Sequence, residues 1–333
     1  MSGGIAQLVA IGAQDAHLVG QPEVSFFRSN YKRHTNFAQT VERQVVQGNP
    51  ATDGMSTVRF ERKGDMLGYV YVASRANTTA NLSGHVSKVE LLIGGQVIDT
   101  QEKIFIEDLA PTVMDQTYSR QSHVKAQSRF IPLRFSFCEN AQSAIPLVAL
   151  QYHDVELRIT WGTLTATDME VYAQFIHLDT DERTSLANTP QNMLVTQTQK
   201  AVASGAGIQE LNFNHPIKYL VSDNSTSEFG VEKMKLQING TDVTDAKSIV
   251  PHFTKAPLYY HTQNANSNSS DVILVPFCLD TSKLQPTGSL NFSRLDSARL
   301  VFEGSANFSA DFYGVNYNIL RIENGMGGLM YSN

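Results

Sequence analysis

The sequence predicts an all-β protein built of two tandem antiparallel β-sandwiches. Three observations support this fold class: a composition that favours strands, many short alternating segments, and an internal repeat. Of the 333 residues, 17% are charged and 41% are hydrophobic, with 17 Phe and 12 Tyr beside a single Trp. Aromatic residues favour strands, and a low charged fraction argues against a coiled coil or a disordered chain.

The internal repeat consists of pairs of similar segments at a nearly constant spacing. Lys88–Gly95 resembles Lys233–Gly240 at an offset of 145, and in both, alternating apolar residues lead into a glycine turn. Val155–Ile159 resembles Ala298–Phe302 at an offset of 143. Further pairs are Phe137-Cys138 with Phe277-Cys278, Val171-Tyr172 with Phe312-Tyr313, and Leu67–Val70 with Ile217–Leu220. Chance similarity is the alternative for any one pair, but the common order indicates a tandem duplication.

Each half of the chain contains seven or eight candidate strands, which fits the eight strands of a jelly roll. In the first half the candidates are Thr40–Gln47, Ser56–Arg62, Met66–Ser74, Lys88–Ile93, Arg129–Cys138, His153–Trp161 and Glu170–Leu178. In the second half they are Asn192–Ala201, Ile208–Phe213, Ile217–Val221, Lys233–Ile238, Asp271–Phe277, Gly288–Phe292, Ala298–Phe302 and Ala310–Ile322.

A short helical insertion and a hinge complete the predicted organisation. The helix is predicted over Gln101–Ser119, where Ile104, Leu109 and Val113 recur near helical spacing. The hinge is expected in Asp181–Pro190, where acidic residues give way to Ser, Asn, Thr and Pro. The predicted domains are an N-terminal arm over 1–25, a first jelly roll over 26–185 and a second jelly roll over 186–333.

Charge argues against a nucleic-acid surface. The net charge of −6 provides no global basic field for phosphates. The segment Arg28–His34 is locally basic with interleaved aromatic residues, a pattern that can bind single-stranded nucleic acid. Because residues 1–50 carry a net charge of only +1, we favour a packing anchor in which Arg and Lys stems lie over aromatic rings.

The sequence shows no disulfide framework and no membrane segment. Cys138 and Cys278 are too few for a disulfide scaffold or a four-cysteine zinc site, and both are predicted to be buried strand residues. The apolar stretch Leu8–Ile11 is too short for a signal peptide, and no run of about 18 apolar residues occurs. We therefore expect a soluble β-rich protein of a reducing compartment.

No constellation of residues indicates catalysis. An enzyme with tandem jelly rolls, a bicupin, needs closely spaced histidines and a carboxylate on facing strands. Here only His252 and His261 are near each other in the sequence. The densest acidic cluster, Asp179–Glu182, could hold a hard cation, but we favour a solvated loop balanced by Arg183. We expect no catalytic residue, no cofactor and no metal site.

Several segments carry a family resemblance. They are Gly3–Asp15, Tyr31–Phe37, Ile131–Cys138, Pro146–Val155, Leu178–Arg183, Asn214–Lys218, Gln285–Asp296 and Val315–Asn333. Together they closely resemble the major capsid proteins of nucleocytoplasmic large DNA viruses, most strongly in the last two segments. Members of that family are usually longer, which implies trimmed loops in this chain.

The resemblance implies two jelly rolls per chain and three chains per capsomer. A cyclic trimer with two similar lobes per chain presents six lobes, which can tile the hexagonal lattice of an icosahedral shell. The implied protein is structural and not an enzyme, is made and assembled in the infected host cell, and lies in the virion. The implied partners are further copies of the chain, minor capsid and penton proteins and the inner viral membrane side, without direct nucleic-acid contact. The alternative is a virion surface protein of the same fold that binds a host receptor or carbohydrate.

Seven Asn-x-Ser/Thr sequons are the candidate modification sites. They are Asn77, Asn81, Asn224, Asn239, Asn268, Asn291 and Asn307. Without a signal peptide the secretory route is closed, so we expect these residues to be unmodified. Some relatives carry capsid glycans attached by their own enzymes, and glycosylation is therefore the alternative.

Overall fold

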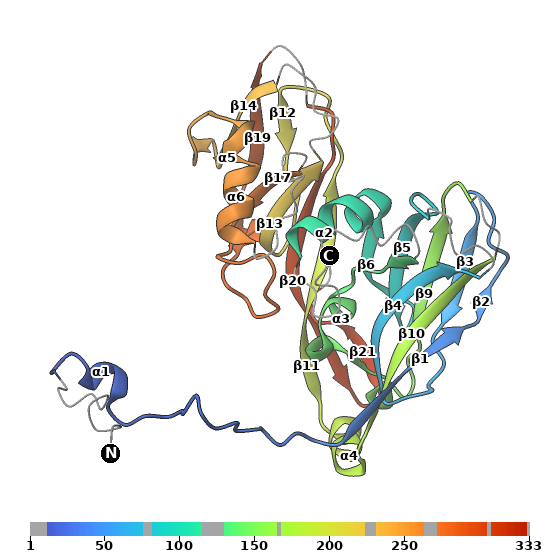
Figure 1. The fold of residues 1–333 in the computed structure, drawn as a ribbon. Coiled ribbons are helices and arrows are strands. Elements are labelled where there is room, and N and C mark those ends of the chain that lie inside the picture. Colours follow the sequence, from blue (N-terminus) through green and yellow to red (C-terminus); the bar gives the residue numbers. More distant parts are fainter. Residues whose placement is uncertain are drawn as a thin grey trace. The chain divides into compact units, whose positions relative to one another are not determined.

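The chain forms two compact units, Met1–Asn36 and Phe37–Asn333, in a computed structural model (Figure 1). The structure describes residues 12–75, 82–114, 130–164, 168–223, 231–262, 272–304 and 308–331. In the smaller unit the described residues form the helical turn α1 (Ala16–Val19) and otherwise an irregular chain. The larger unit contains four β-sheets.

The first half of the larger unit forms two antiparallel sheets. Sheet A has the strand order β1-β10-β4-β7, with β8 also pairing β4. Its strands are β1 (Phe37–Gln44), β4 (Met66–Ser74), β7 (Phe130–Pro132), β8 (Ile145–Pro146) and β10 (Met169–Leu178). Sheet B has the order β2-β3-β9-β5-β6. Its strands are β2 (Val46–Gln47), β3 (Met55–Arg59), β5 (Val86–Ile93), β6 (Gln96–Glu102) and β9 (Val155–Trp161).

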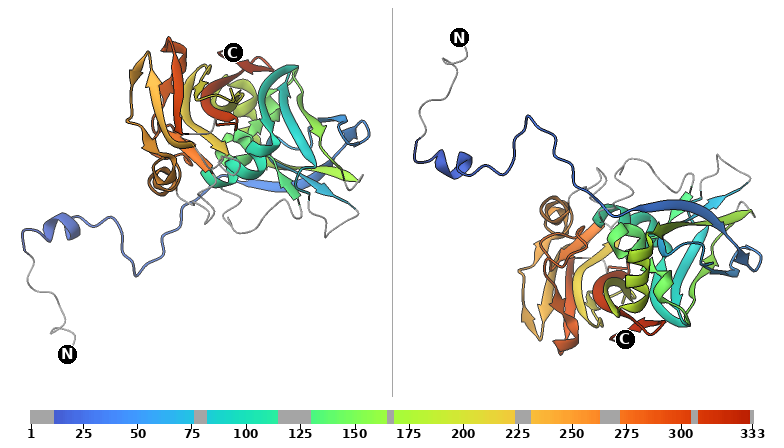
Figure 2. Two further views of the ribbon diagram at one scale, coloured as in Figure 1. Left: turned by 90° about the horizontal axis from the view of Figure 1, so that it is seen from above. Right: turned by 90° about the horizontal axis from the view of Figure 1, so that it is seen from below.

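The second half forms two further sheets, which lie beside the first pair (Figure 2). Sheet C has the order β11-β20-β13-β17, and sheet D the order β12-β19-β14-β15. The strands of sheet C are β11 (Gln191–Ala201), β13 (Pro216–Asp223), β17 (Val272–Pro276), β18 (Leu290–Asn291), β20 (Phe312–Glu323) and β21 (Met326–Leu329). Those of sheet D are β12 (Ile208–Glu210), β14 (Val231–Ile238), β15 (Thr241–Asp242), β16 (Lys247–Ser248) and β19 (Ala298–Gly304).

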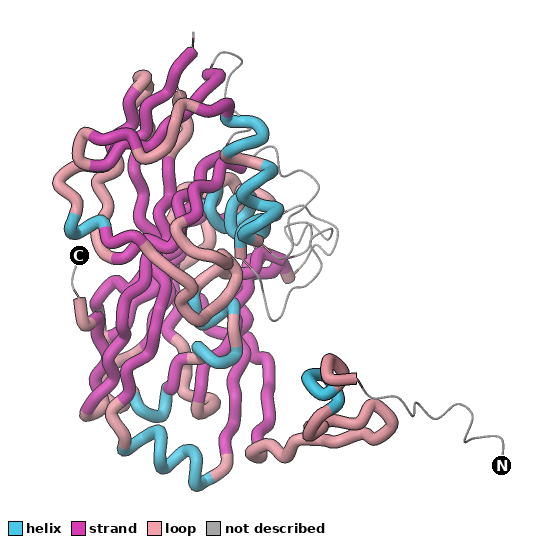
Figure 3. Tube along the Cα trace, turned by 90° about the vertical axis from the view of Figure 1, so that its left-hand side faces the viewer, coloured by secondary structure: helices cyan, strands magenta, loops and turns pink. Residues whose placement is uncertain are grey.

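The strand order confirms the predicted duplication. Sheet C repeats the connectivity of sheet A, and sheet D repeats β3-β9-β5-β6 of sheet B. β5 and β14 begin 145 residues apart, and β9 and β19 begin 143 apart, the same offsets as in the sequence. The predicted fold class of two tandem jelly rolls is therefore confirmed, and strands run through both halves (Figure 3).

Both predicted hairpin turns have the same backbone geometry. Gly94 and Gly95 have φ of +58° and +82°, and Asn239 and Gly240 have φ of +50° and +78°. Two successive positive φ angles define the type I′ turn, whose twist matches that of the flanking strands. The turns join β5 to β6 and β14 to β15.

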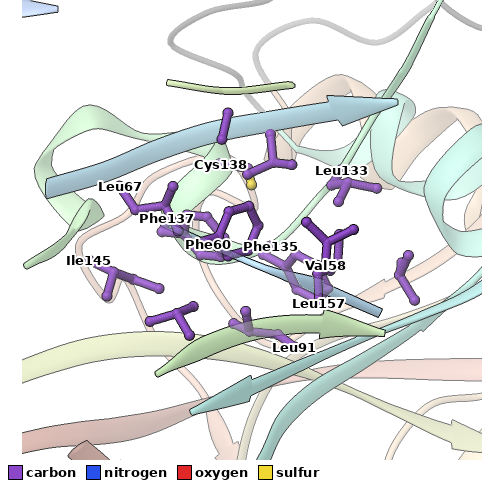
Figure 4. Close-up of a cluster of buried hydrophobic side chains, with 14 of the residues drawn as sticks. Val58, Phe60, Leu67, Leu91, Leu133, Phe135, Phe137, Cys138, Ile145 and Leu157 are labelled. Carbon is purple, nitrogen blue, oxygen red and sulfur yellow. The ribbon is translucent and has the colours of Figure 1, made fainter. Parts of the chain in front are cut away.

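Alternating burial along the strands builds a core between the two sheets of each half. In β9, Val155, Leu157, Ile159 and Trp161 are buried while their neighbours are half-buried. These residues join a cluster that includes side chains from both sheets (Figure 4). The Trp161 Nε1–H donates to Ser56 Oγ at 2.9 Å, which satisfies the one polar group of this ring.

The helices correct three sequence predictions. They are η1 (Phe105–Leu109, a π-helical turn), α2 (Ala110–Val113), α3 (Ser136–Glu139), α4 (Thr180–Asn188), α5 (Ile249–His252) and α6 (Lys255–His261), with short 3₁₀ turns η3 (Ala141–Ser143), η4 (Leu147–Ala149) and η6 (Phe292–Arg294). The predicted strand Arg129–Cys138 is wrong beyond Pro132: strand β7 covers Phe130–Pro132, and Ser136–Glu139 forms helix α3, where the backbone N–H groups of Cys138 and Glu139 donate to the Phe135 carbonyl at 2.8 and 3.2 Å.

The helical insertion is confirmed in part, and the predicted hinge segment connects the two halves but is mostly helical. Gln101 and Glu102 still belong to β6, so helical structure begins after them, and residues 115–119 lie outside the described residues. The predicted hinge Asp181–Pro190 is mostly helix α4, whose N-terminus is capped by the Asp179 carboxylate accepting from Thr180 N at 2.8 Å. The domain boundaries at 25/26 and 185/186 stay predictions.

We predict that deleting Asp311–Asn333 abolishes cooperative folding. The deletion removes β20, the strand between β11 and β13, and exposes the cores of both halves, because Phe312 packs in the second half and Leu320 in the first. Solubility and thermal melting measure the effect, with a chain that ends at Tyr331 as the matched control. A soluble deletion protein with an unchanged melting temperature would show that β20 is not a core strand.

Candidate assembly surfaces

The helical insertion of the first half covers the outer face of sheet C. Phe105, Leu109 and Val113 are fully buried against Tyr219 and Tyr313 and their neighbours on β13 and β20. The rings of Phe105 and Tyr313 lie 5.9 Å apart between their centroids. Figure 1 shows α2 beside β13 and β20, between the two pairs of sheets. The inner strands β13 and β20 of sheet C are therefore buried on both faces over most of β13 and the first seven residues of β20, and the two halves share an apolar contact.

Charged groups frame this contact. Glu102 Oε2 at the end of β6 accepts hydrogen bonds from Lys200 Nζ at 2.7 Å and from the Tyr313 hydroxyl at 3.0 Å. Lys200 also pairs with Asp311 at 2.9 Å. Burial raises the pKa of Tyr313, and the Glu102 carboxylate beside it acts in the same direction. The hydroxyl therefore stays protonated and bridges the first half to the second.

A buried carboxylate lies where β6 meets β11. Asp99 Oδ1 accepts from the backbone N–H groups of Thr198 at 2.7 Å and Thr100 at 2.9 Å, and its Oδ2 accepts from Gln101 Nε2 at 2.8 Å. Beside it, Gln197 Nε2 donates to the Ile98 carbonyl. Burial raises the pKa of Asp99 to about 7, against the opposing effect of the three donors.

The long strands of sheet C also enter the first core. Val195 of β11 and Leu320 and Ile322 of β20 pack in the cluster formed mostly by residues of sheets A and B. Together with the helical insertion and the buried polar contacts, they fix the second half against the first. Such a chain can act as a rigid building block with two similar lobes.

A buried lysine supports the base of sheet C. Lys218, in the segment that carried part of the family resemblance, is 4% exposed and donates from Nζ to the Lys283 carbonyl at 2.9 Å. Its ammonium lies 5.9 Å from the ring centroids of Tyr219 and Tyr317. Burial lowers the pKa of Lys218 to about 8. These partners belong to the fold itself, so a structural role explains this lysine.

The outer face of sheet A carries a second set of aromatic side chains, Tyr71, Tyr172 and Phe130, which we call the aromatic stripe. The Tyr71 ring stacks on Tyr172 with centroids 5.3 Å apart and meets the edge of Phe130 at 5.6 Å. The two tyrosines are half-buried, and Phe130 is 38% exposed. The stripe therefore leaves aromatic surface accessible on the face of a rigid sheet.

A third aromatic group lies on helix α6. Tyr259 and Tyr260 are 78% and 77% exposed, and their rings meet edge to face at 5.0 Å. Leu258 between β17 and these tyrosines is fully buried and anchors the helix to sheet C. Sequence reasoning missed both surfaces. One signal for the stripe was present, because strand Met66–Ser74 carries large apolar residues on both of its faces.

The acidic cluster Asp179–Glu182 forms the N-terminus of α4, so the prediction of a solvated loop is wrong. Arg183 pairs with Asp65, the residue before β4, and its Nε lies 2.8 Å from Asp65 Oδ1. This pairing helps to lower the pKa of Asp65 against the effect of its burial. Within the described ranges, no group of three or more His, Cys, Asp or Glu side chains is arranged to hold a metal ion. None of the described helices is long and apolar enough to cross a membrane.

One further prediction needs correction. Cys138 and Cys278 are free and buried as expected, but Cys138 lies in helix α3 and Cys278 follows β17, so neither is a strand residue. Within the smaller unit, Phe26, Phe27 and Tyr31 of the basic segment are 95%, 98% and 82% exposed, and the packing anchor stays a prediction.

Two of the seven sequons lie in the described residues. The Asn239 side-chain oxygen accepts from the backbone N–H groups of Asp296 and Ser297 at 3.0 and 3.1 Å. The Asn291 side-chain oxygen caps η6 through Ser293 N at 3.0 Å. Asn77, Asn81, Asn224, Asn268 and Asn307 lie outside the described residues. That the sequons are unmodified stays a prediction.

These features describe a class of protein. The chain contains two jelly rolls with the same strand order, joined by a buried apolar contact. Together they form a rigid structural block that offers surfaces and strand edges to partners. Two family models match the chain: residues 25–205 match the N-terminus of major capsid proteins, and residues 221–328 match the large eukaryotic DNA virus major capsid protein.

Individual relatives agree with the family models. The chain is 31% identical over 396 aligned positions to the major capsid protein of Pyramimonas orientalis virus, and 28% identical over 440 positions to that of Paramecium bursaria Chlorella virus 1, with full coverage of both chains in each case. Among solved structures, it matches a chain of the PBCV-1 virus capsid with a TM-score of 0.76 and 25% identity, covering 93% of this chain and 100% of the other.

The chain belongs to the family of large eukaryotic DNA virus major capsid proteins. It is a structural protein of the virion shell and not an enzyme. Both alignments are longer than the chain's 333 residues, which agrees with the expectation that this chain is short for its family. The alternative of a receptor- or carbohydrate-binding virion protein finds no support in these relatives.

We predict that Asp99→Asn flattens the pH dependence of stability between pH 4 and pH 7. Because the folded-state pKa of about 7 lies above the unfolded value, the stability that Asp99 contributes is full below about pH 4 and is lost as pH rises through 7. The unfolding free energy from urea titrations at pH 5 and pH 8 measures this effect. We expect the wild-type difference to shrink by about 2 kcal/mol.

The matched control for this measurement is Glu210→Gln, at an exposed carboxylate on β12. The control should leave the pH difference unchanged. An Asp99→Asn protein with the wild-type pH profile would contradict the elevated pKa of the buried carboxyl group.

Proposed function

We propose that the chain assembles as a homotrimer that forms a pseudo-hexagonal capsomer and tiles the icosahedral shell of a large DNA virus. The observation that carries this proposal is the duplicated topology. Sheets A and B form one jelly roll, and sheets C and D form another with the same strand order. Three such chains in a ring present six similar lobes, a number that fits a hexagonal lattice site, whereas one chain presents only two.

The rigidity of the chain supports the same proposal. A lattice of hexagonal blocks requires that the two lobes of each block keep a fixed relation. The covered face of sheet C, the Glu102–Lys200–Asp311 group and the shared strands β11 and β20 supply that relation. Neighbouring lobes in the ring then differ in surface chemistry, which sets the orientation of adjacent capsomers.

The N-terminal arm supplies contacts outside the jelly rolls. The smaller unit contains no strand among its described residues, and strand structure starts at Phe37. Exposed aromatic and basic side chains of this arm form contacts with neighbouring subunits or with the capsid interior. The domain division into an arm over 1–25 and jelly rolls over 26–185 and 186–333 belongs to this proposal.

Further partners follow from the position in the shell. After trimer formation, the same chain contacts neighbouring capsomers, minor capsid and penton proteins, and the inner viral membrane side. The net charge of −6 argues against direct contact with nucleic acid. The place of assembly in this proposal is the infected host cell.

We predict that the purified protein sediments as a trimer and that salt weakens it little. With only 17% charged residues, few ions are desolvated on contact, and apolar burial of order 2,000 Å² or more per contact supplies the main stabilisation. Sedimentation equilibrium at several protein and salt concentrations measures the mass. A persistent monomer at micromolar concentration would refute the trimer and the six-lobed block.

We predict that removing residues 1–20 leaves a folded trimer with impaired shell assembly. These residues lie before the first strand and in a unit separate from the jelly rolls. Circular dichroism and sedimentation test the fold and the trimer, and electron microscopy of assembly reactions tests the shell. Loss of folding on removal of the arm would place it in the core instead.

A further inference from the structure

We propose that the exposed aromatic face of α6 in one chain docks on the aromatic stripe of sheet A in a second copy. This proposal rests on the proposed trimer and names the surfaces that close its ring. In one half of the chain the equivalent contact already exists within the molecule.

Helices α2 and α6 are equivalent elements of the duplication. α2 lies between β6 and β7, and α6 lies between β16 and β17, where β15 and β16 together pair with β14 as β6 pairs with β5. The dipeptide Ala110-Pro111 of α2 recurs as Ala256-Pro257 of α6 at an offset of 146, close to the offsets of the strands. By the same offset, Val113 corresponds to Tyr259.

The outer faces of sheets A and C are equivalent as well. Tyr172 on β10 corresponds to Tyr313 on β20. Across the ladder, Arg43 is the register partner of Tyr172, as Lys200 is of Tyr313. An ion pair flanks each face, Arg43 with Glu170 at 2.9 Å in sheet A and, at the same distance, Lys200 with Asp311 in sheet C.

The two halves differ in what covers these faces. On sheet C, Tyr313 is 1% exposed because η1 and α2 of the first half lie over it. On sheet A, Tyr71 and Tyr172 keep part of their surface accessible and Phe130 keeps more. The helices differ in the complementary way, since Val113 is fully buried whereas Tyr259 is 78% exposed. Each chain thus presents one accessible face and one exposed helix of matching character.

A second copy satisfies both surfaces at once. Within a chain, the insertion of the first jelly roll covers the second. Between chains, α6 of the second jelly roll covers the first jelly roll of the next chain, so each of six lobes donates one helix and receives one. This contact joins two different patches, and a head-to-tail contact that repeats with threefold rotation closes a ring. Figure 1 shows α6 on the flank of the second pair of sheets, away from the first pair.

The chemistry of the two patches fits a protein–protein contact. Tyrosines supply large contact area at low cost in side-chain entropy, and aromatic pairs gain from edge-to-face and offset packing. Buried tyrosines also dominate many interfaces energetically. We call Tyr259 and Tyr260 on α6 the donating patch. Leu279 extends it, because this residue is 75% exposed and its carbonyl hydrogen-bonds with His261 of α6.

The donating patch is tested with Tyr259→Ala/Tyr260→Ala in the full chain. We expect sedimentation to show single chains at micromolar concentration where the wild type is trimeric, with unchanged circular dichroism because both side chains are exposed. The matched control is Tyr152→Ala, which removes a tyrosine that is 74% exposed on the first half and should leave the trimer intact.

The receiving face is tested with Tyr71→Arg, which should also give single chains. Mixing it with the α6 variant distinguishes a head-to-tail contact from a symmetric one. The Tyr71→Arg chain retains a normal α6 and the α6 variant retains a normal stripe, so one good contact forms between them and the ring cannot close. We expect one-to-one heterodimers and no trimers.

A crosslinking measurement does not depend on weakening the trimer. The full chain with Tyr71→Cys and Tyr260→Cys, treated with a bifunctional maleimide, should give covalent trimers, and either single substitution should give none. Cys138 and Cys278 are buried and leave the background low. If the α6 variant is still trimeric and no crosslinked trimer forms, the docking is wrong while the trimer itself stands. If the wild type is monomeric, both proposals are wrong.

Discussion

The covered outer face of sheet C is the contact on which the rest of the structure depends. A jelly roll standing alone buries one face of each sheet, and the strands of sheet B show this as alternating burial along β9. In sheet C, the first seven residues of β20 are all buried, because the second half supplies one core and the first half supplies the other. Separating the two halves would expose Tyr219, Val221 and Tyr313 together. The second jelly roll therefore depends on the helical insertion of the first half to cover its outer face.

The duplication explains why the chain carries a counterpart of each of the two surfaces that form this contact. Both halves inherited a helical insertion between equivalent strands and a sheet with aromatic side chains on its outer face. Within one chain, geometry allows only one of the two insertions to cover a neighbouring lobe, since a chain of two lobes has one junction. The second insertion and the first face therefore keep an accessible aromatic surface, which is a property of the open chain rather than of either jelly roll alone.

Much of the fold could be predicted from the sequence, because strand periodicity and turn residues are local signals. Met66–Ser74 coincides with β4, and the turns at Gly94 and Asn239 follow from residues that tolerate positive φ. Helix α4 could not be predicted this way, because none of its residues is buried and its sequence therefore has no hydrophobic period. The Asp179 cap and the Asp65–Arg183 ion pair stabilise this helix instead. The contact between the two halves could not be predicted either, because Glu102, Lys200 and Asp311 are far apart in the sequence and meet only in the folded chain.

In the proposed docking, one type of contact serves both folding and assembly. The contact within the chain buries its aromatic rings fully and forms once, during folding. A contact between chains must leave the separate chain soluble, and half-buried tyrosines suit this role because the ring edge packs on the sheet while the hydroxyl faces water. In the stripe, the Tyr172 hydroxyl donates to Glu170 at 2.8 Å, so this polar group is satisfied before any partner arrives. In the proposed docking, a second chain buries apolar ring surface without removing that hydrogen bond.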